Sequence, residues 1–128
     1  MDEQGKQLII EGSDTGSIKI SDDVVKIIAG IAAMEVEGVS AMSGGIADGI
    51  VEKLGRKNLS RGVKAEVGEK DSKIEISVII EYGKPIKEVA SRIQARIKEA
   101  VESMTGLKVV EVNVNVQGVS FAKEIQEE

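Results

Sequence analysis

Apolar and polar residues alternate along three stretches of the chain, as they do in strands that bury one face. The stretches are 63–67, 74–80 and 107–117. The first two flank a short polar turn and therefore predict a β-hairpin. In the third, the valines at 110, 112, 114 and 116 are expected to share one face, and Gly118 is expected to end the strand.

Two segments repeat their apolar residues at helical spacing. The first, 22–36, starts after Ser21 in an N-cap position and ends before Gly38. Its apolar stripe is so wide that most of its circumference should be buried. The second starts at Pro85, expected at the first helical position, and ends before Gly106. Its opposite side is charged, so it should lie on the surface with one face in the core.

The order of the elements is β-α-loop-β-β-α-β, in which the first strand is a short one expected at 16–20, and a further short strand is expected at 7–11. Each main strand has one aliphatic face, and only the helices can cover it. The sequence therefore predicts an α+β fold, a two-layer sandwich in which a small, mainly antiparallel sheet carries two main helices on one face. We expect a single domain at 16–119, a partly flexible N-terminal segment at 1–15 and an acidic tail at 120–128.

The composition narrows the possible functions. The 128 residues include no cysteine, histidine or tryptophan, which removes thiolate sites and the commonest general base and metal ligand. We expect no enzyme activity, no metal site and no cofactor. The net charge of −5 and the single tyrosine and phenylalanine argue against a nucleic-acid surface. A cytoplasmic location is expected, because neither a membrane-spanning stretch nor a signal-peptide pattern is present.

Acidic and glycine-rich positions could carry chemistry, but each has a plainer interpretation. The glycine-rich segment 44–49 lacks the spacing of a phosphate-binding loop. Glu35 and Glu37 could form one acid–base pair, and Glu75 and Glu81 another. Nothing in the sequence places two of these carboxylates in an apolar pocket, so a solvated surface is favoured.

Two asparagines and the single tyrosine also have both a functional and a plainer interpretation. Asn113 and Asn115 alternate with valines beside Glu111 and could bind an ion through oxygen ligands. Alternating polar residues are also what an exposed sheet face looks like, and this interpretation is favoured. Tyr82 precedes the second helix, and its ring is expected to pack on the first turn of that helix.

The segment 53–64 concentrates positive charge in an otherwise acidic chain. It carries five of the 17 basic residues and none of the 22 acidic ones. We expect it to contact an anionic membrane surface or an acidic face of a partner protein. The alternative is a solvated loop. The residues expected to make the contact are Lys53, Arg56, Lys57, Arg61 and Lys64.

Short motifs in a fixed order resemble the alkaline shock protein family, the envelope stress-response proteins of Gram-positive bacteria. The resemblance covers 16–119 and rests on the combination, since each motif alone is short. In chain order the motifs are Gly16-Ser17-Ile18-Lys19-Ile20-Ser21, Glu37-Gly38-Val39, Ser43-Gly44-Gly45, Leu54-Gly55-Arg56-Lys57, Ile80-Glu81-Tyr82-Gly83, Ile93-Gln94, Thr105-Gly106-Leu107 and Val112-Asn113-Val114.

The resemblance implies a small cytoplasmic protein without enzyme activity that serves cell-envelope homeostasis. It also implies self-association and peripheral attachment at the inner membrane face through a membrane-embedded protein. The family brings no catalytic residues with it. Strand edges independently favour a homo-oligomer, formed through edges or the polar sheet face rather than through an apolar patch.

A KH-like nucleic-acid-binding module is the alternative function. The order helix–strand–strand–helix–strand resembles such domains. The acidic net charge, the missing Gly-x-x-Gly loop and the scarcity of aromatic residues stand against it. A nucleic-acid partner is therefore not expected.

Overall fold

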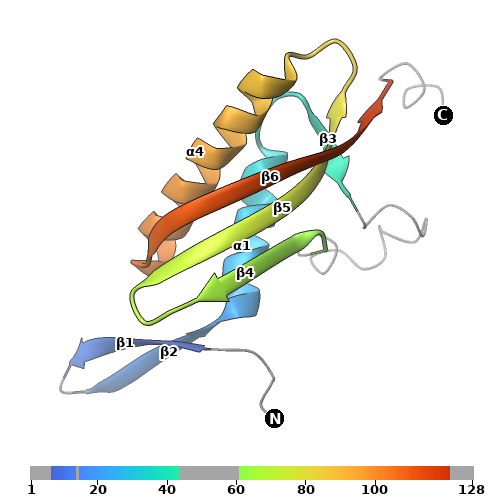
Figure 1. Cartoon of the computed structure of the whole chain (residues 1–128). Helices are drawn as coiled ribbons and strands as arrows, with labels where there is room; N and C mark the ends of the chain where they lie inside the picture. Colours follow the sequence, from blue (N-terminus) through green and yellow to red (C-terminus); the bar gives the residue numbers. More distant parts are fainter. Residues whose placement is uncertain (1–6, 14, 44–60, 122–128) are drawn as a thin grey trace.

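The computed structural model describes residues 7–13, 15–43 and 61–121, which form two layers (Figure 1). One layer is a four-stranded sheet, and the other is a pair of helices on one of its faces. This confirms the α+β sandwich expected from the sequence. The helices are α1 (Asp22–Met34) and α4 (Ile86–Thr105), and the strands of the sheet are β3 (Val39–Met42), β4 (Val63–Val67), β5 (Asp71–Glu81) and β6 (Lys108–Ser120).

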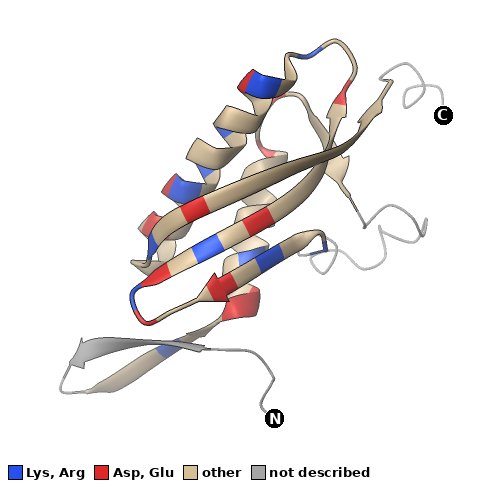
Figure 2. Ribbon diagram, viewed as in Figure 1, with Lys and Arg blue, Asp and Glu red and all other residues tan. Residues whose placement is uncertain are grey.

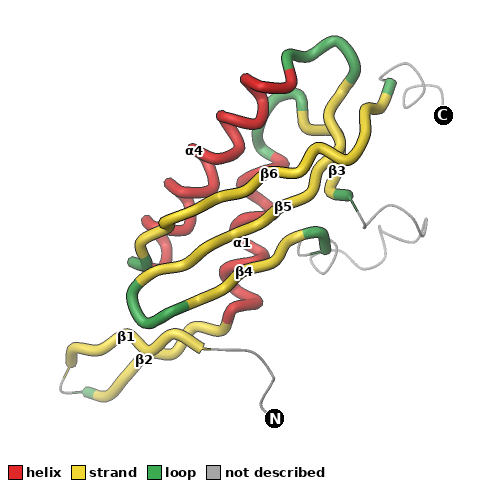
Figure 3. The backbone as a smooth tube through the Cα atoms, in the orientation of Figure 1, coloured by secondary structure: helices red, strands yellow, loops and turns green. Residues whose placement is uncertain are grey.

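Strand β5 is the centre of the sheet and pairs along both of its sides. β3 and β4 lie antiparallel to it on one side, end to end, and β6 runs parallel to it on the other (Figure 3). Ser77 marks the junction of β3 and β4. Its N–H donates to the carbonyl of Gly62 at 2.9 Å, and its carbonyl accepts from the N–H of Ser43 at 3.0 Å.

The core lies between β5 and the helices. Ile74, Ile76, Val78 and Ile80 are buried, whereas the residues between them are exposed or half-buried. β-Branched side chains suit this position because they are stiff and fill a pleated surface well. From the helices, the side chains that complete this core include Val25, Ile28, Ala29, Val89, Ile93, Ile97 and Val101.

The end of α1 packs closely on α4. α1 ends at Met34, two residues earlier than expected, and Gly38 then turns the chain into β3 with φ of +103°. A Cβ atom at Gly38 would lie 2.9 Å from Cγ2 of Val89 in α4. Glycine is therefore required here both by the backbone conformation and by the close approach.

Strand β6 departs from the predicted strand at two β-bulges. The first leaves Val110 as the extra residue between Val109 and Glu111, so Val109 is buried and Val110 is 48% exposed. The second lies between Val116 and Gly118, after which the strand continues to its end at Ser120. The predictions that Val110 faces the core and that Gly118 ends the strand are therefore wrong.

The N-terminal part of the chain adds a small hairpin. β1 (Gln7–Ser13) and β2 (Gly16–Ser21) pair antiparallel in a separate two-stranded sheet, which lies below the main sheet in Figure 1. The two short strands expected at the N-terminus are thus confirmed.

The start of helix α4 differs by one residue from the prediction. Pro85 is the N-cap of α4 rather than its first residue, because its ψ of 108° is extended and not helical.

Replacing Gly62 by alanine should destabilise the junction of β3 and β4. Gly62 has φ of +80°, and a Cβ atom there would clash with the carbonyl oxygen of Ser43. Gly83 also has a positive φ, but a Cβ atom there would meet no atom within 4 Å. Gly83→Ala should therefore lower the unfolding free energy by about 1–2 kcal/mol through backbone strain alone. Gly62→Ala should cost ~1–3 kcal/mol more through the clash.

Urea denaturation of both variants and the wild type measures these losses. Gly83→Ala is the matched control, since it changes the same residue type in the same backbone region. Equal losses in the two variants would contradict the close contact between Gly62 and Ser43.

Candidate interaction surfaces

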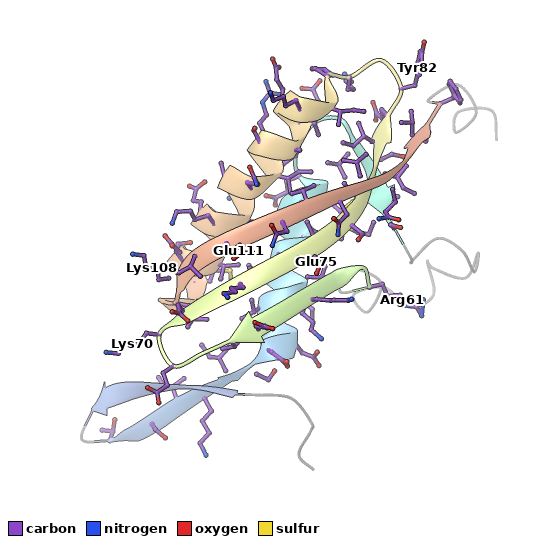
Figure 4. All side chains as sticks on the ribbon, viewed as in Figure 1. Arg61, Lys70, Glu75, Tyr82, Lys108 and Glu111 are labelled. Atoms are coloured by element: carbon purple, nitrogen blue, oxygen red, sulfur yellow. The ribbon has the colours of Figure 1, made fainter. Side chains whose placement is uncertain are left out.

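The structure describes only the last four residues, 61–64, of the basic segment 53–64. Lys53, Arg56 and Lys57 lie outside the described residues, as does the glycine-rich segment 44–49. Arg61, in the turn just before β4, and Lys64, near the start of that strand, are both exposed, and Figure 4 labels Arg61 beside the N-terminal end of β4. Joint contact of the five basic residues with an anionic surface stays a prediction.

The sheet face opposite the helices carries both signs of charge. Across β4, β5 and β6, Lys64 lies opposite Glu75, which lies opposite Asn113. One step along, the strands present Glu66, Lys73 and Glu111 in the same way. Figure 2 shows the alternation of positive and negative side chains on this face. Lys64 therefore belongs to a balanced surface rather than to a purely basic one.

Asparagines on this face are occupied by hydrogen bonds within the protein. Asn113 Nδ2 donates to Glu111 Oε2 at 2.7 Å, and Asn115 Nδ2 donates to Glu75 Oε2 at 2.9 Å. In Figure 4, Glu75 and Glu111 project from neighbouring strands of the same face. Among the described residues, no three acidic side chains gather closely enough to hold a metal ion. The arrangement supports a solvated contact surface.

Glu35 and Glu37 form ion pairs with cations across the molecule. Arg96 of α4 donates to Glu35 Oε1 through Nη2 at 2.7 Å and through Nε at 3.0 Å. Lys84 Nζ lies 3.4 Å from Glu37 Oε2. Both carboxylates remain on the surface, as the favoured interpretation expects, and help to join the end of α1 to α4 and its preceding turn rather than forming an acid–base pair.

The two aromatic rings of the chain contact one another. The ring centroids of Tyr82 and Phe121 are 5.0 Å apart, at the end of β5 and just after β6. Tyr82 is 67% exposed and Phe121 is 47% exposed. The expectation that Tyr82 packs on the first turn of α4 is therefore wrong. The N–H of Tyr82 donates to the carbonyl of Ser120 at 2.7 Å, which joins the end of β5 to the end of β6 beside Phe121.

Helix α1 exposes a second apolar stripe that we did not predict. Val24, Ile31 and Met34 are each about two-fifths exposed, although the rest of the helix is mostly buried. Their spacing of seven and three residues places them on one face. The apolar stripe of the sequence is wider than the face of α1 that the sheet and α4 cover, so these three residues at its margin stay exposed.

The free edge of β6 is partly closed by side chains of α4. Glu102 Oε2 accepts the N–H of Val109 at 2.9 Å, and Lys98 Nζ lies 3.5 Å from the Val109 carbonyl. Gln94 Nε2 donates to the carbonyl of Val112 at 3.0 Å. No sequence signal marks these contacts, because each joins a helix side chain to the backbone of a strand.

Glu102 is held in its ionised form at this edge. Its carboxylate accepts hydrogen bonds from Lys98 Nζ at 2.9 Å and from the N–H of Val109. The bond from Lys98, followed by that from Val109, lowers the pKa of Glu102 below its ordinary value near 4.5. The connection between α4 and β6 therefore includes a charge-assisted contact.

Comparison with known proteins identifies the family. The profile of the Asp23 family, whose description is cell envelope-related function, matches residues 11–121. The chain belongs to this family. The family name is unrelated to the residue at position 23. The match confirms the resemblance to the alkaline shock proteins that the motifs indicate.

Individual relatives agree with this assignment. The chain is 35% identical to Bacillus subtilis YqhY over 91% of its length and 87% of that protein. It is 39% identical to Bacillus subtilis YloU over 81% of its length and 88% of that protein. A Streptococcus pyogenes protein named stress response regulator gls24 homolog is 30% identical over 88% of this chain, which spans 64% of that longer protein.

Solved structures add little to the family assignment. A domain named MamM-CTD aligns with 76% of this chain and 96% of its own length, with 13% identity and a TM-score of 0.47. This likeness is too weak to bear on function. Within residues 7–13, 15–43 and 61–121, neither helix is long and apolar enough to cross a membrane.

The contact at Glu102 should make stability depend on pH. Because the pKa of Glu102 is lowered by folding, its contribution is present above about pH 4.5 and is lost as pH falls through the lower folded value. Glu102→Gln keeps an oxygen for the N–H of Val109 but removes the charge. Between about pH 6 and pH 3, the unfolding free energy of this variant should fall less steeply than that of the wild type.

Denaturant titrations across this pH range test the contact. Glu99→Gln is the control, because Glu99 lies on the same helix, pairs with Arg96 at 3.4 Å and leaves the bonds of Glu102 in place. It should keep the steeper wild-type dependence. If Glu102→Gln were as steep as the wild type, the ionic contact would not contribute to folding.

Proposed function

We propose that this member of the Asp23 family is a non-enzymatic, self-associating scaffold of the envelope stress response, acting near the inner face of the membrane. The family description and the relative named stress response regulator support the stress and envelope part of the proposal. The scaffold part is supported by the outer edge of β6, which side chains of α4 close only in part. Exposed edges of this kind pair with other chains unless they are blocked.

The described surface suits binding rather than catalysis. Its polar face balances positive and negative side chains and carries amides that are already bonded to carboxylates. Such a face matches another mixed surface and favours specificity over tight binding. The domain also exposes two apolar features, the stripe of α1 in the helix layer and the pair of Tyr82 with Phe121 at the end of the sheet. Together these offer several contact areas on one small domain.

Self-association is the first part of the proposal to test. Sedimentation velocity of the pure protein, from low to high micromolar concentration, should show a species larger than the monomer whose share of the protein rises with concentration. A tagged protein at native levels should also recover copies of itself and a membrane protein from its own cells. A strictly monomeric protein would overturn the scaffold, and recovery of nucleic acid alone would favour the KH-like alternative.

The basic segment is proposed to support attachment by contacting anionic lipid. Each basic residue near an anionic membrane contributes about 1 kcal/mol, and the effect decays within a Debye length of roughly 8 Å at physiological salt. A few such residues give weak, salt-sensitive binding that assists a protein tether. Arg56→Glu combined with Lys57→Glu should therefore abolish co-sedimentation with anionic liposomes at low salt, while circular dichroism stays unchanged.

A matched control separates local contact from overall charge. Lys70→Glu combined with Lys87→Glu makes the same change in net charge at two exposed residues outside the segment. This control should bind liposomes nearly as well as the wild type. Equal loss in both double variants would show that net charge alone matters, and absence of wild-type binding would leave the segment as a solvated loop.

A further inference from the structure

Backbone hydrogen bonds show which residues of β6 direct their N–H and carbonyl groups away from β5, toward the outer edge of the sheet. Ser77 of β5 uses both its N–H and its carbonyl toward β3 and β4. Backbone groups alternate sides along a strand, so the neighbours of Ser77 use theirs toward β6. On β6, the carbonyl of Val112 faces outward to Gln94. The same alternation then turns the N–H and carbonyl groups of Val114 and Val116 to the free edge.

Only the first half of this edge is closed by α4. The side chains of Gln94, Lys98 and Glu102 reach Val109 and Val112. Among the described residues, no side chain of α4 makes such a contact beyond Val112. At the far end, the bulge between Val116 and Gly118 changes the alternation. The open part of the edge is therefore short, and it is centred on Asn115.

The open part lacks the features that protect natural edges. Residues 112–120 include no charged side chain and no proline. Charged residues and prolines are the usual means by which edge strands avoid pairing. Val114 and Val116 are, in addition, only half-buried against the core. An uncharged edge with unused backbone groups and half-covered valines is suited to accept another strand.

We propose that this edge pairs antiparallel with the same edge of a second copy, about a two-fold axis at Asn115. The inference rests on the self-association put forward above and names its interface. Val114 then lies opposite the partner's Val116, and each pair exchanges reciprocal N–H···O bonds on its side of the axis. These bonds use only groups that no side chain of α4 occupies.

A two-fold axis at Val114 fits less well. It would place Val112 opposite the partner's Val116 and would need the carbonyl of Val112, which already accepts from Gln94. The axis at Asn115 avoids this competition. An isologous contact of this kind also closes on itself, so it produces a dimer rather than a filament.

Side chains are self-complementary in this register. On the polar face of the sheet, Asn115 lies opposite the partner's Asn115, and Asn113 lies opposite the partner's Gln117. On the helix face, valine meets valine, so apolar surface that is half-exposed in one copy becomes covered in two. The result joins two four-stranded sheets into one continuous sheet with its helices on a common face.

Cysteine cross-linking tests the register directly, because the chain contains no cysteine. Asn115→Cys should form a disulfide dimer under mild oxidation. Residues opposite each other in a non-hydrogen-bonded antiparallel pair have Cα atoms about 4.5 Å apart, within the range for disulfides. Asn113→Cys and Gln117→Cys should not cross-link alone, because their counterparts lie on the order of 13 Å away along the strand. A mixture of these two variants should cross-link.

The competing apolar surface is probed in the same experiment. Ile31→Cys places a thiol on the exposed stripe of α1. If the wild type self-associates while Ile31→Cys cross-links and Asn115→Cys does not, the edge interface is wrong and the scaffold stands. The edge interface is also wrong if Asn113→Cys or Gln117→Cys cross-links alone. A wild type that stays monomeric in sedimentation overturns both the interface and the scaffold.

A second variant tests the interface without a cross-link, by removing a hydrogen-bond donor from the edge of β6. Val116→Pro deletes an outward N–H that the sheet itself does not use, and edge strands tolerate proline at such positions. Its dimer dissociation constant should rise at least about tenfold, since it loses bonds on both sides of the axis. Unchanged association of a folded Val116→Pro variant would overturn the interface. If this variant fails to fold, the cysteine series decides the question alone.

Discussion

The rest of the molecule depends on one constraint, the alternation of side chains and backbone groups along strand β5. One set of its residues supplies Ile74, Ile76, Val78 and Ile80 to the core, and the intervening set, apart from Ile79, forms the polar face. The same alternation divides its backbone groups between β3 and β4 on one side and β6 on the other. A slip of one residue in β5 would exchange the two faces and both sets of strand partners at once.

Much of this arrangement could be predicted from the sequence, because periodicity reports which face of an element is buried. The strands at 63–67 and 74–80 and the second helix follow their patterns closely. Val110 shows where this logic stops. A β-bulge shifts the phase of alternation by one residue, and the valine run 109–110 fits either phase equally well. The pattern cannot reveal such a bulge, since it depends on how the neighbouring strand fits.

Contact surfaces were less predictable than the core. The basic residues stand out because charge is visible in the sequence, yet Lys64 proves to face Glu75 in the adjacent strand. Conversely, the closure of the β6 edge by Gln94 and Glu102 leaves no trace in the sequence, because a polar helix residue looks the same whether it reaches solvent or a backbone group. Tyr82 likewise depends on where the end of β6 brings Phe121. Surfaces follow from tertiary geometry, whereas cores follow from composition and period.

The junction at Ser77 has a consequence for how this domain can vary. Ser43 and Gly62 are bound to opposite backbone groups of that one residue, so the chain leaves the sheet and rejoins it at nearly the same point. The sequence between Ser43 and Gly62 therefore only has to close a loop whose two ends lie next to each other. Loop-closure entropy grows only slowly with length, by about 0.6 kcal/mol per doubling. The sheet therefore sets little limit on the length of the sequence between these two positions, and a reporter domain could be inserted there without disturbing the strands.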